Sequence, residues 1–267
     1  MSAAPVAPVA PVAPVAPVLE LRQATMRFGG VVALDDVSLS VSPGRVTCLL
    51  GENGAGKSTV IGILSGVQRP TQGEVRVDGR EVTLASPRQA HALGIATVYQ
   101  TLALVPLMAV WRNFFLGEEP TRGRGPLRRL DVARCRRESR AALETMGIAL
   151  RDVDRPVGAL SGGERQAIAI ARALHFGARV LILDEPTAAL GVKQAEIVLE
   201  QVARARERGA AVLLVTHNPA HALRAGDDFV VLRRGRLAAR LPAAEATIER
   251  LARLMGGDEE ESAGSPA

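Results

Sequence analysis

The chain reads Gly51-Glu52-Asn53-Gly54-Ala55-Gly56-Lys57-Ser58-Thr59 directly after the apolar run Val46–Leu50. Glycines in such a loop let backbone N–H groups approach an anion without a clash from a Cβ atom. The spacing Gly-x-x-x-x-Gly-Lys-Ser matches a loop that wraps phosphates, whose lysine reaches the β- and γ-phosphates and whose next hydroxyl ligates Mg²⁺. We therefore expect a buried strand over Val46–Leu50, a nucleotide-binding loop over 51–59 and a helix over 58–64. Thr59 is expected to meet the α-phosphate.

Two acidic residues, Asp184 and Glu185, follow a second apolar run over 180–183. A carboxylate at the end of a buried strand is costly unless it meets a cation. We predict that Asp184 meets Mg²⁺, and that Glu185, which points differently, polarises an attacking water as a general base. Two acidic residues at a strand exit are common in proteins, but Pro186-Thr187 after them and the phosphate loop before them favour a catalytic role.

The stretch Leu160-Ser161-Gly162-Gly163-Glu164 precedes this acidic strand. Ser161, Gly162 and Gly163 are too small to build a core, but they suit close contact with an anion. They open a predicted helix, where unpaired N–H groups and the positive end of the helix dipole favour negative charge.

Composition describes an ordinary globular chain of 267 residues, 47% hydrophobic, with a net charge of +5. This length suits one large domain or a domain with a side lobe. The only lysines are Lys57 and Lys193, so the basic balance is mostly arginine and we interpret it as a compositional bias. Cys48 and Cys135 lack metal-ligand spacing, and we expect reduced thiols in a reducing compartment. No run approaches the roughly 20 apolar residues of a spanning helix, so a membrane role would need another chain to span.

One basic stretch gathers Arg122, Arg124, Arg128, Arg129, Arg134, Arg136 and Arg137. Nucleic-acid surfaces often interleave such charges with stacking aromatic residues, and none is interleaved here. We therefore expect a solvated face, and no nucleic-acid partner.

The chain divides into three parts. Residues 1–17 repeat Ala-Pro-Val, which favours polyproline II, and we predict a disordered tail that is not a signal peptide. Residues 256–267 are acidic and rich in Gly, Ser and Pro, and are predicted to be a second disordered tail. Between them, over 18–255, strands alternate with helices, which predicts an α/β fold with a mostly parallel sheet. Residues 18–22 alternate as an edge strand does, and 101–159 are predicted to form a helical side lobe.

In their order along the chain, these motifs resemble the ATP-binding subunits of ABC transporters over about 18–255. The resemblance implies a P-loop NTPase core, an N-terminal antiparallel β subdomain, ATP and Mg²⁺ as ligands, and ATP hydrolysis. It implies that Gln100 senses the γ-phosphate and Mg²⁺, and that His217 contacts the γ-phosphate and links to Glu185. It also implies that Ser161, Gly162 and Gly163 touch ATP bound to the other subunit. Phe28 is the candidate adenine platform, with a core phenylalanine as the competing interpretation.

Two further stretches of sequence, 111–117 and 189–194, resemble those of the monosaccharide importers of the fructose and ribose type. This resemblance implies three partners: membrane permease subunits, a second ATP-binding subunit in a homodimer, and indirectly an external solute-binding protein. It places the chain peripherally on the cytoplasmic face of the membrane. The alternatives are an importer of a non-sugar solute, a non-transport ABC ATPase, and a nucleotide-dependent regulator. One position departs from the family pattern: Gly191 stands where an aspartate normally couples the two sites.

Overall fold

The structure is a computed structural model that describes residues 16–150 and 152–256. Residues 1–15 and 257–267, which make up most of the two predicted tails, lie outside the described residues. The domain boundaries drawn from the sequence therefore remain predictions.

The central sheet has six strands in the order β12-β11-β3-β10-β9-β6. Their bounds are β3 Val46–Leu50, β6 Ile95–Val98, β9 Val180–Asp184, β10 Ala211–Thr216, β11 Asp228–Arg233 and β12 Arg236–Pro242. All neighbours are parallel except β12, which pairs antiparallel with β11. Continuous apolar runs such as 46–50 form strands that are buried on both faces, as a mostly parallel sheet requires. The predicted sheet is confirmed, and β11 and β12 extend it at an edge that the sequence motifs did not indicate.

A second, antiparallel sheet has the order β2-β1-β4-β5, with bounds β1 Leu19–Phe28, β2 Val31–Val41, β4 Gln72–Val77 and β5 Arg80–Val82. It is the predicted β subdomain. The prediction of an edge strand over 18–22 is wrong, because Leu21 pairs with Leu39 on one side and with Val75 on the other. Alternating polarity reports one buried face, and this is equally compatible with an interior strand of an antiparallel sheet.

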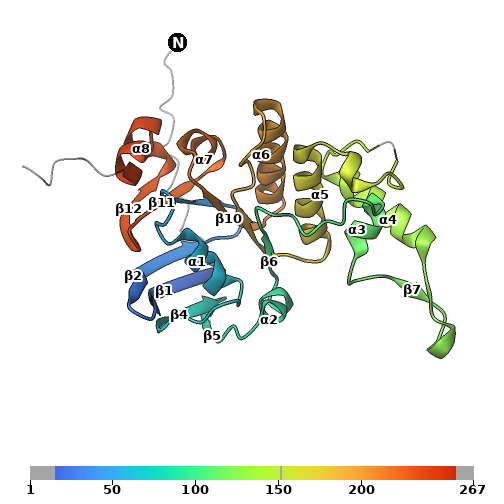
Figure 1. Cartoon of the computed structure of the whole chain (residues 1–267), viewed down its shortest axis with the longest axis horizontal. Helices are drawn as coiled ribbons and strands as arrows, with labels where there is room; N and C mark the ends of the chain where they lie inside the picture. The colour runs from blue at the N-terminus through green and yellow to red at the C-terminus, as the bar shows by residue number, and fades with distance from the viewer. Residues whose placement is uncertain (1–15, 151, 257–267) are drawn as a thin grey trace, which may run out of the picture.

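Helices cover both faces of the central sheet (Figure 1). Helix α1 (Lys57–Leu64) and α2 (Pro87–Ala92) pack with the antiparallel sheet on one face, where Leu49 and Ile182 belong to their core. The other face packs against α5 (Gly162–His175), α6 (Val192–Glu207), α7 (Pro219–Ala225) and α8 (Ile248–Gly256). The described residues also form short 3₁₀ turns, η1 (Gly125–Leu127), η2 (Val157–Ala159) and η3 (Ala243–Glu245).

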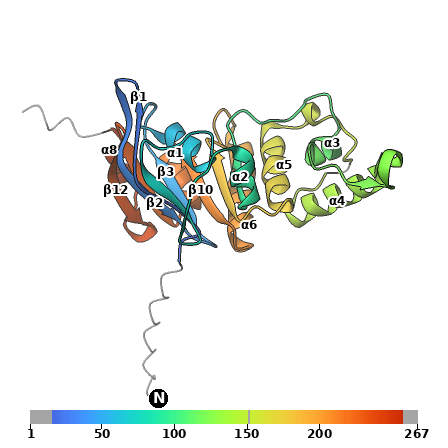
Figure 2. The ribbon, with the colours of Figure 1, turned by 90° about the horizontal axis from the view of Figure 1, so that it is seen from below.

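The side lobe lies at one end of the molecule in both views (Figures 1 and 2) and contains α3 (Val110–Phe115) and α4 (Val132–Thr145). Helix α4 is capped by Asp131, whose carboxylate accepts a hydrogen bond from the Arg134 backbone N–H at 3.0 Å. A short hairpin of β7 (Thr121–Arg122) and β8 (Arg129–Leu130) was not predicted, because each strand is only two residues long.

Parallel strands place their carboxyl ends at one edge of the central sheet. Strand β3 ends at the phosphate loop, β9 ends at Asp184, β6 ends two residues before Gln100, and β10 ends next to His217. In open α/β sheets ligands bind at this edge. The fold therefore gathers these four segments, which are far apart in sequence, at one place.

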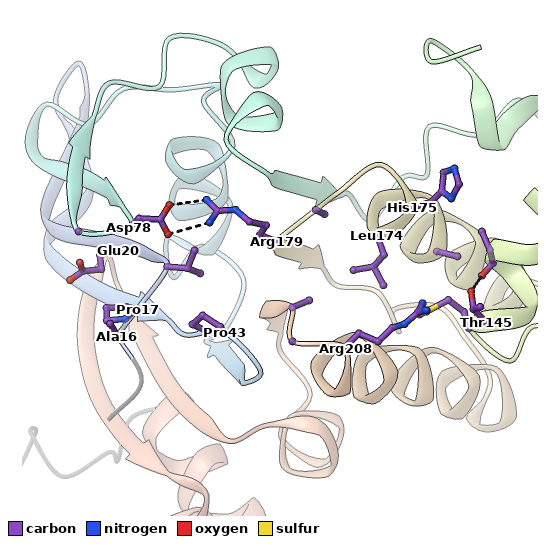
Figure 3. Close-up of a pocket in the computed structure, with 18 residues that line it drawn as sticks. Ala16, Pro17, Glu20, Pro43, Asp78, Thr145, Leu174, His175, Arg179 and Arg208 are labelled. Atoms are coloured by element: carbon purple, nitrogen blue, oxygen red, sulfur yellow. Dashed lines mark hydrogen bonds and ion pairs between the residues drawn. The ribbon is translucent and has the colours of Figure 1, made fainter. Parts of the chain in front are cut away.

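A cavity of about 770 Å³ lies instead near the amino ends of β9 and β10, where Arg179 and Ala210 line it (Figure 3). Arg179 pairs with Asp78 of the antiparallel sheet at 2.9 Å. This cavity is separate from the edge that carries the phosphate loop.

Candidate functional site

The phosphate loop depends on glycine at two positions. A Cβ atom at Gly51 would lie 2.5 Å from the carbonyl oxygen of Leu232, and one at Gly56 would lie 2.8 Å from the side chain of Leu34. Both glycines also have positive φ, which side chains disfavour. Gly54 has positive φ as well, but open space surrounds it, so its backbone is free to approach a ligand.

Lys57 occupies the centre of this loop and is 8% exposed. Its ammonium donates hydrogen bonds to the carbonyl oxygens of Gly51 at 2.6 Å and Glu52 at 3.1 Å, and lies 3.8 Å from the carboxylate of Glu185. Burial lowers the pKa of Lys57, and the charges of Glu185 and Asp184 oppose this shift. The ammonium is therefore held inside the loop by carbonyl oxygens and carboxylates.

A cavity of about 510 Å³ joins the loop to the carboxyl ends of the strands. The predicted site residues that line it are Glu52, Asn53, Gly54, Gly56, Lys57, Ser58, Thr59, Gln100, Asp184 and Glu185. The residues around this one space thus include a lysine, two hydroxyl residues, two amide residues and three carboxylate residues.

Asp184 and Glu185 differ in their surroundings. Burial raises the pKa of Asp184, the neighbouring Glu185 charge adds to the rise, and Lys57 opposes it. Glu185 has a φ of 47°, a left-handed conformation that is rare for a residue with a side chain. Its N–H donates to the carbonyl oxygen of Val215 at 2.9 Å, and its carboxylate lies 2.9 Å from Nδ1 of His217. The loop after β9 and the loop after β10 are therefore tied together through Glu185.

A second tie joins the same two loops and was missed by sequence reasoning. The hydroxyl of Thr187, which is buried, lies 2.9 Å from Nδ1 of His221. His221 stands in the first turn of α7, where the Asn218 side chain caps the helix by accepting from the His221 N–H. The available sequence signal was a second histidine shortly after His217, in the first turn of the helix that follows it.

We predict that Asp184→Asn raises the thermal stability of the chain without nucleotide near neutral pH. A raised pKa means that the native state binds the proton more tightly than the unfolded chain, so this contribution to stability is full below the unfolded pKa and is lost as pH rises through the folded pKa. Asparagine carries no charge at any pH, so the variant does not lose stability through ionisation at this position as pH rises. Thermal unfolding at pH 7 should show the gain, and the gain should shrink below the normal carboxyl pKa of about 3.9. A variant less stable than the wild type at pH 7 would contradict the assigned desolvation.

The Ser161 hydroxyl accepts from the Glu164 N–H at 3.2 Å, and the Glu164 carboxylate accepts from the Ser161 N–H at 2.7 Å. This capping box begins α5 at Gly162. A Cβ at Gly162 would lie 2.6 Å from the Leu190 side chain, and one at Gly163 would lie 2.8 Å from the Gln194 carbonyl oxygen. The small residues therefore also have a packing role within the chain.

The structure does not bring these three residues into the phosphate cavity. Gly162 instead lines a neighbouring cavity of about 360 Å³, together with Leu190 and with Gln100 and Glu185, which border both spaces. The start of α5 is thus close to the phosphate cavity but outside it.

Phe28 ends strand β1, is 46% exposed and pairs with Val31 across the β1–β2 hairpin. It is therefore no core residue, although the phosphate cavity is lined by Val31 and Val32 rather than by Phe28 itself. Arg234, at the turn between β11 and β12, also lines the cavity. Sequence motifs missed these lining residues because they lie on hairpins far from the loop in sequence.

The donor set fits a magnesium nucleotide. Among the described residues, no group of three or more His, Cys, Asp or Glu side chains is arranged to hold a metal. Mg²⁺ bound with a nucleotide needs no such group, because one or two carboxylates are enough when phosphate oxygens and water complete its shell. Ser58, Asp184 and Gln100 supply suitable oxygens on one cavity, and Lys57 supplies the positive charge.

Fold and cavity together define a nucleotide-binding α/β cassette, and comparison with known proteins places it in a family. Residues 34–188 match the family described as ABC transporter. The chain is 40% identical to the xylose/arabinose import ATP-binding protein XylG of Sulfolobus acidocaldarius, with 89% of this chain and 93% of that protein covered. It is 41% identical to the fructose import ATP-binding protein FrcA of Rhizobium meliloti, with 82% and 85% covered.

A solved structure agrees with this placement. The ADP conformation of MJ1267, an ATP-binding cassette of an ABC transporter, superposes with a TM-score of 0.77 at 26% identity and covers 91% of this chain and 96% of its own. The chain therefore belongs to the ABC transporter family, as one of its ATP-hydrolysing cassettes. Among the described helices, none has the length and apolar character needed to cross a bilayer.

Proposed function

We propose that this chain is the ATPase subunit that powers import of a monosaccharide through a membrane permease. The observation that carries the proposal is its similarity, over most of both chains, to ATP-binding proteins for xylose/arabinose and fructose import. The resemblance of 111–117 and 189–194 to the same class supports it from the sequence. The subunit would act peripherally, on the cytoplasmic face of the membrane.

The cavity suggests how its residues divide the work. Lys57 and the N–H groups of the phosphate loop would neutralise and orient the phosphate chain of ATP. Ser58, Asp184 and Gln100 would hold Mg²⁺, which when bound supplies positive charge to the phosphate oxygens. Glu185 would accept a proton from the attacking water, and His217, 2.9 Å away, would hold the carboxylate in position and reach the γ-phosphate. Catalysis of this kind is mostly positioning and charge stabilisation.

We further propose that two such chains share two ATP molecules. Ser161, Gly162 and Gly163 lie outside the phosphate cavity of their own chain, at the positive end of helix α5. In a paired arrangement this helix end would complete the partner's pocket. Gly191 is the N-cap residue of α6 and offers no side chain to cap the helix. The carboxylate that normally couples the two sites at this position is therefore missing. We expect the two pockets to act more independently than in relatives with aspartate.

The permease would dock beside the side lobe. A groove of about 450 Å³ is lined by Tyr99, residues 101–104, Leu116 and Phe176. The apolar segment 102–108 divides here: Leu102 and Leu104 pack against the core, whereas Leu107 is 90% exposed. Leu102 and Leu104 therefore have a packing role within the chain, and the exposure of Leu107 supports contact with a partner. An external solute-binding protein would act only through the permease.

Complementation tests the shared sites. Lys57→Ala and Ser161→Arg chains should each be almost inactive, because each homodimer lacks one half of both pockets. Mixed, they should regain roughly a quarter of the wild-type ATPase rate, since half of randomly paired dimers hold one whole pocket. The rate per subunit of the wild type should also fall on dilution below the dimer dissociation constant. A rate that is constant on dilution and a mixture without recovery would contradict sharing.

Solute class is tested by co-purifying the membrane partner and measuring ATP hydrolysis with solute-loaded binding proteins. We expect stimulation by a monosaccharide-loaded protein. Stimulation by another solute class would establish the non-sugar alternative. Salt-dependent affinity for nucleic acid would instead favour a non-transport ATPase. Absence of steady-state hydrolysis with the permease would favour the nucleotide-dependent regulator.

A further inference from the structure

An arginine occupies a turn whose backbone disfavours it. Arg233 pairs with Arg236 at the end of the β11–β12 hairpin, so Arg234 and Gly235 form a two-residue loop. Both have positive φ, 48° at Arg234 and 77° at Gly235. Positive φ at both central residues characterises the type I′ hairpin turn, which strongly prefers Asn-Gly, Asp-Gly or Gly-Gly.

A second hairpin of the same chain has the residues that this turn type prefers. The β4–β5 turn also has two residues of positive φ, and there they are Asp78 and Gly79, at 50° and 73°. Arg234 therefore holds a strained conformation where a better residue is available. Strain of this kind persists when the surroundings impose it, and it gathers at functional sites.

The surroundings of the turn fasten it to the phosphate loop. The Gly235 N–H donates to the carbonyl oxygen of Ala55 at 3.0 Å, and the Gly235 carbonyl oxygen accepts from the Asp35 N–H at 2.8 Å. A Cβ atom at Gly235 would lie 2.7 Å from the Ala33 carbonyl oxygen, so the packing is close. The position of the Arg234 backbone is thus set by the loop that holds Lys57.

Arg234 is exposed and lines the phosphate cavity. Arg234 lines the same cavity as Lys57 and Ser58, and no hydrogen bond or ion pair holds its side chain within 16–150 and 152–256. The nearby Arg236 does have one, because its Nε donates to Asp35 at 2.9 Å. The cavity therefore presents two cations of different kinds: a buried ammonium already bonded to carbonyl oxygens, and an exposed guanidinium with free donors.

We propose that Arg234 is a nucleotide-binding residue that contacts the phosphate chain of the nucleotide held by the loop 51–59. The inference rests on the proposed nucleotide site and adds to it a residue from the far end of the chain. A guanidinium presents several donors in a planar fork and suits phosphate oxygens well. Its neighbour Gly235 is hydrogen-bonded to Ala55, so the turn keeps Arg234 beside the phosphate loop, where its charge would supplement that of Lys57.

The proposal predicts opposite effects on stability and on binding. Arg234→Asn places the preferred residue in the turn, so the melting temperature of the full chain without nucleotide should rise or stay unchanged. Its affinity for ATP and ADP should fall about tenfold, equivalent to about 1.4 kcal/mol, and this deficit should shrink at high salt. Arg234→Lys keeps a charge and should lose less affinity than Arg234→Asn. Calorimetric titration with a non-hydrolysable ATP analogue and Mg²⁺ measures binding, and thermal unfolding measures stability.

Arg233→Asn is the matched control, because Arg233 is also exposed and basic, stands next in the chain and does not line the cavity. It should bind nucleotide as the wild type does. Wild-type affinity in Arg234→Asn would overturn the proposal, as would equal losses in the two variants. A loss in Arg234→Asn accompanied by a lower melting temperature, with no recovery in Arg234→Lys, would assign the effect to folding and also overturn it. A wild-type chain that binds no nucleotide, or a Lys57→Ala chain that binds as well as the wild type, would refute the nucleotide site itself.

Discussion

Glu185→Gln is expected to bind ATP with nearly wild-type affinity while its hydrolysis rate falls by about 10²–10⁴-fold, the usual contribution of general acid–base catalysis. Glutamine keeps the shape of the side chain and an oxygen within reach of His217, but an amide does not accept the proton of an attacking water. The phosphate loop that binds ATP lies on another strand and remains intact. Single-turnover hydrolysis measures the loss, and a fluorescent ATP analogue measures affinity.

Under the proposal that two chains share their pockets, the same variant should accumulate as an ATP-bound dimer, because the hydrolysis that would open the pockets is blocked. Light scattering with and without ATP shows the change in mass. Glu200→Gln is the control, since Glu200 is exposed on α6, away from the cavity, and should hydrolyse ATP normally. Rapid turnover by Glu185→Gln would remove Glu185 as the base and leave nucleotide binding by the cavity untouched.

Lys57→Ala is expected to reduce ATP affinity by at least about 30-fold. Removing one partner of a buried charge pair typically costs 2–5 kcal/mol, and each 1.4 kcal/mol is a factor of ten. Here the loss has two sources: the phosphates lose their ammonium, and Glu185, 3.8 Å away, keeps a charge without its partner. Titration calorimetry measures the affinity, and circular dichroism confirms the fold.

The chain provides a control for this variant, because Lys193 is its only other lysine and is exposed at the start of α6. Lys193→Ala should bind ATP as the wild type does. An unchanged affinity in Lys57→Ala would mean that the loop 51–59 does not hold the phosphates. Equal losses in both variants would point to a general effect of net charge.

Local features of the site could be predicted from the sequence because local physics determines them. The glycines of the phosphate loop and the apolar strand 46–50 each follow from residues within a few positions. The ABC resemblance supplied Gln100, and the structure brings it to the same cavity as Asp184 and Glu185, at the edge where parallel strands end. The ABC resemblance supplied the link between His217 and Glu185, and the structure places their side chains 2.9 Å apart.

Features that depend on pairing across the chain could not be predicted. The alternation of residues 18–22 does not reveal that a partner strand begins at Gln72, so an interior strand was taken for an edge. The tie between Thr187 and His221, and the place of Arg234 beside the phosphate loop, both require knowledge of which loops become neighbours. From the sequence, the small size of Gly162 suggested contact with an anion. In the structure the missing side chain also leaves room for Leu190.

The loop after β9 contributes to two different parts of the proposed sites, and this has a genetic consequence. One short segment begins with Glu185, on the phosphate cavity, and ends with Leu190 against Gly162, on the helix end proposed to serve the partner. In a homodimer both loops come from one gene, so a single substitution at Leu190 would alter all four half-pockets at once. Suppressors of such a mutation are then expected at Gly162, which lies against the Leu190 side chain, and not at distant positions.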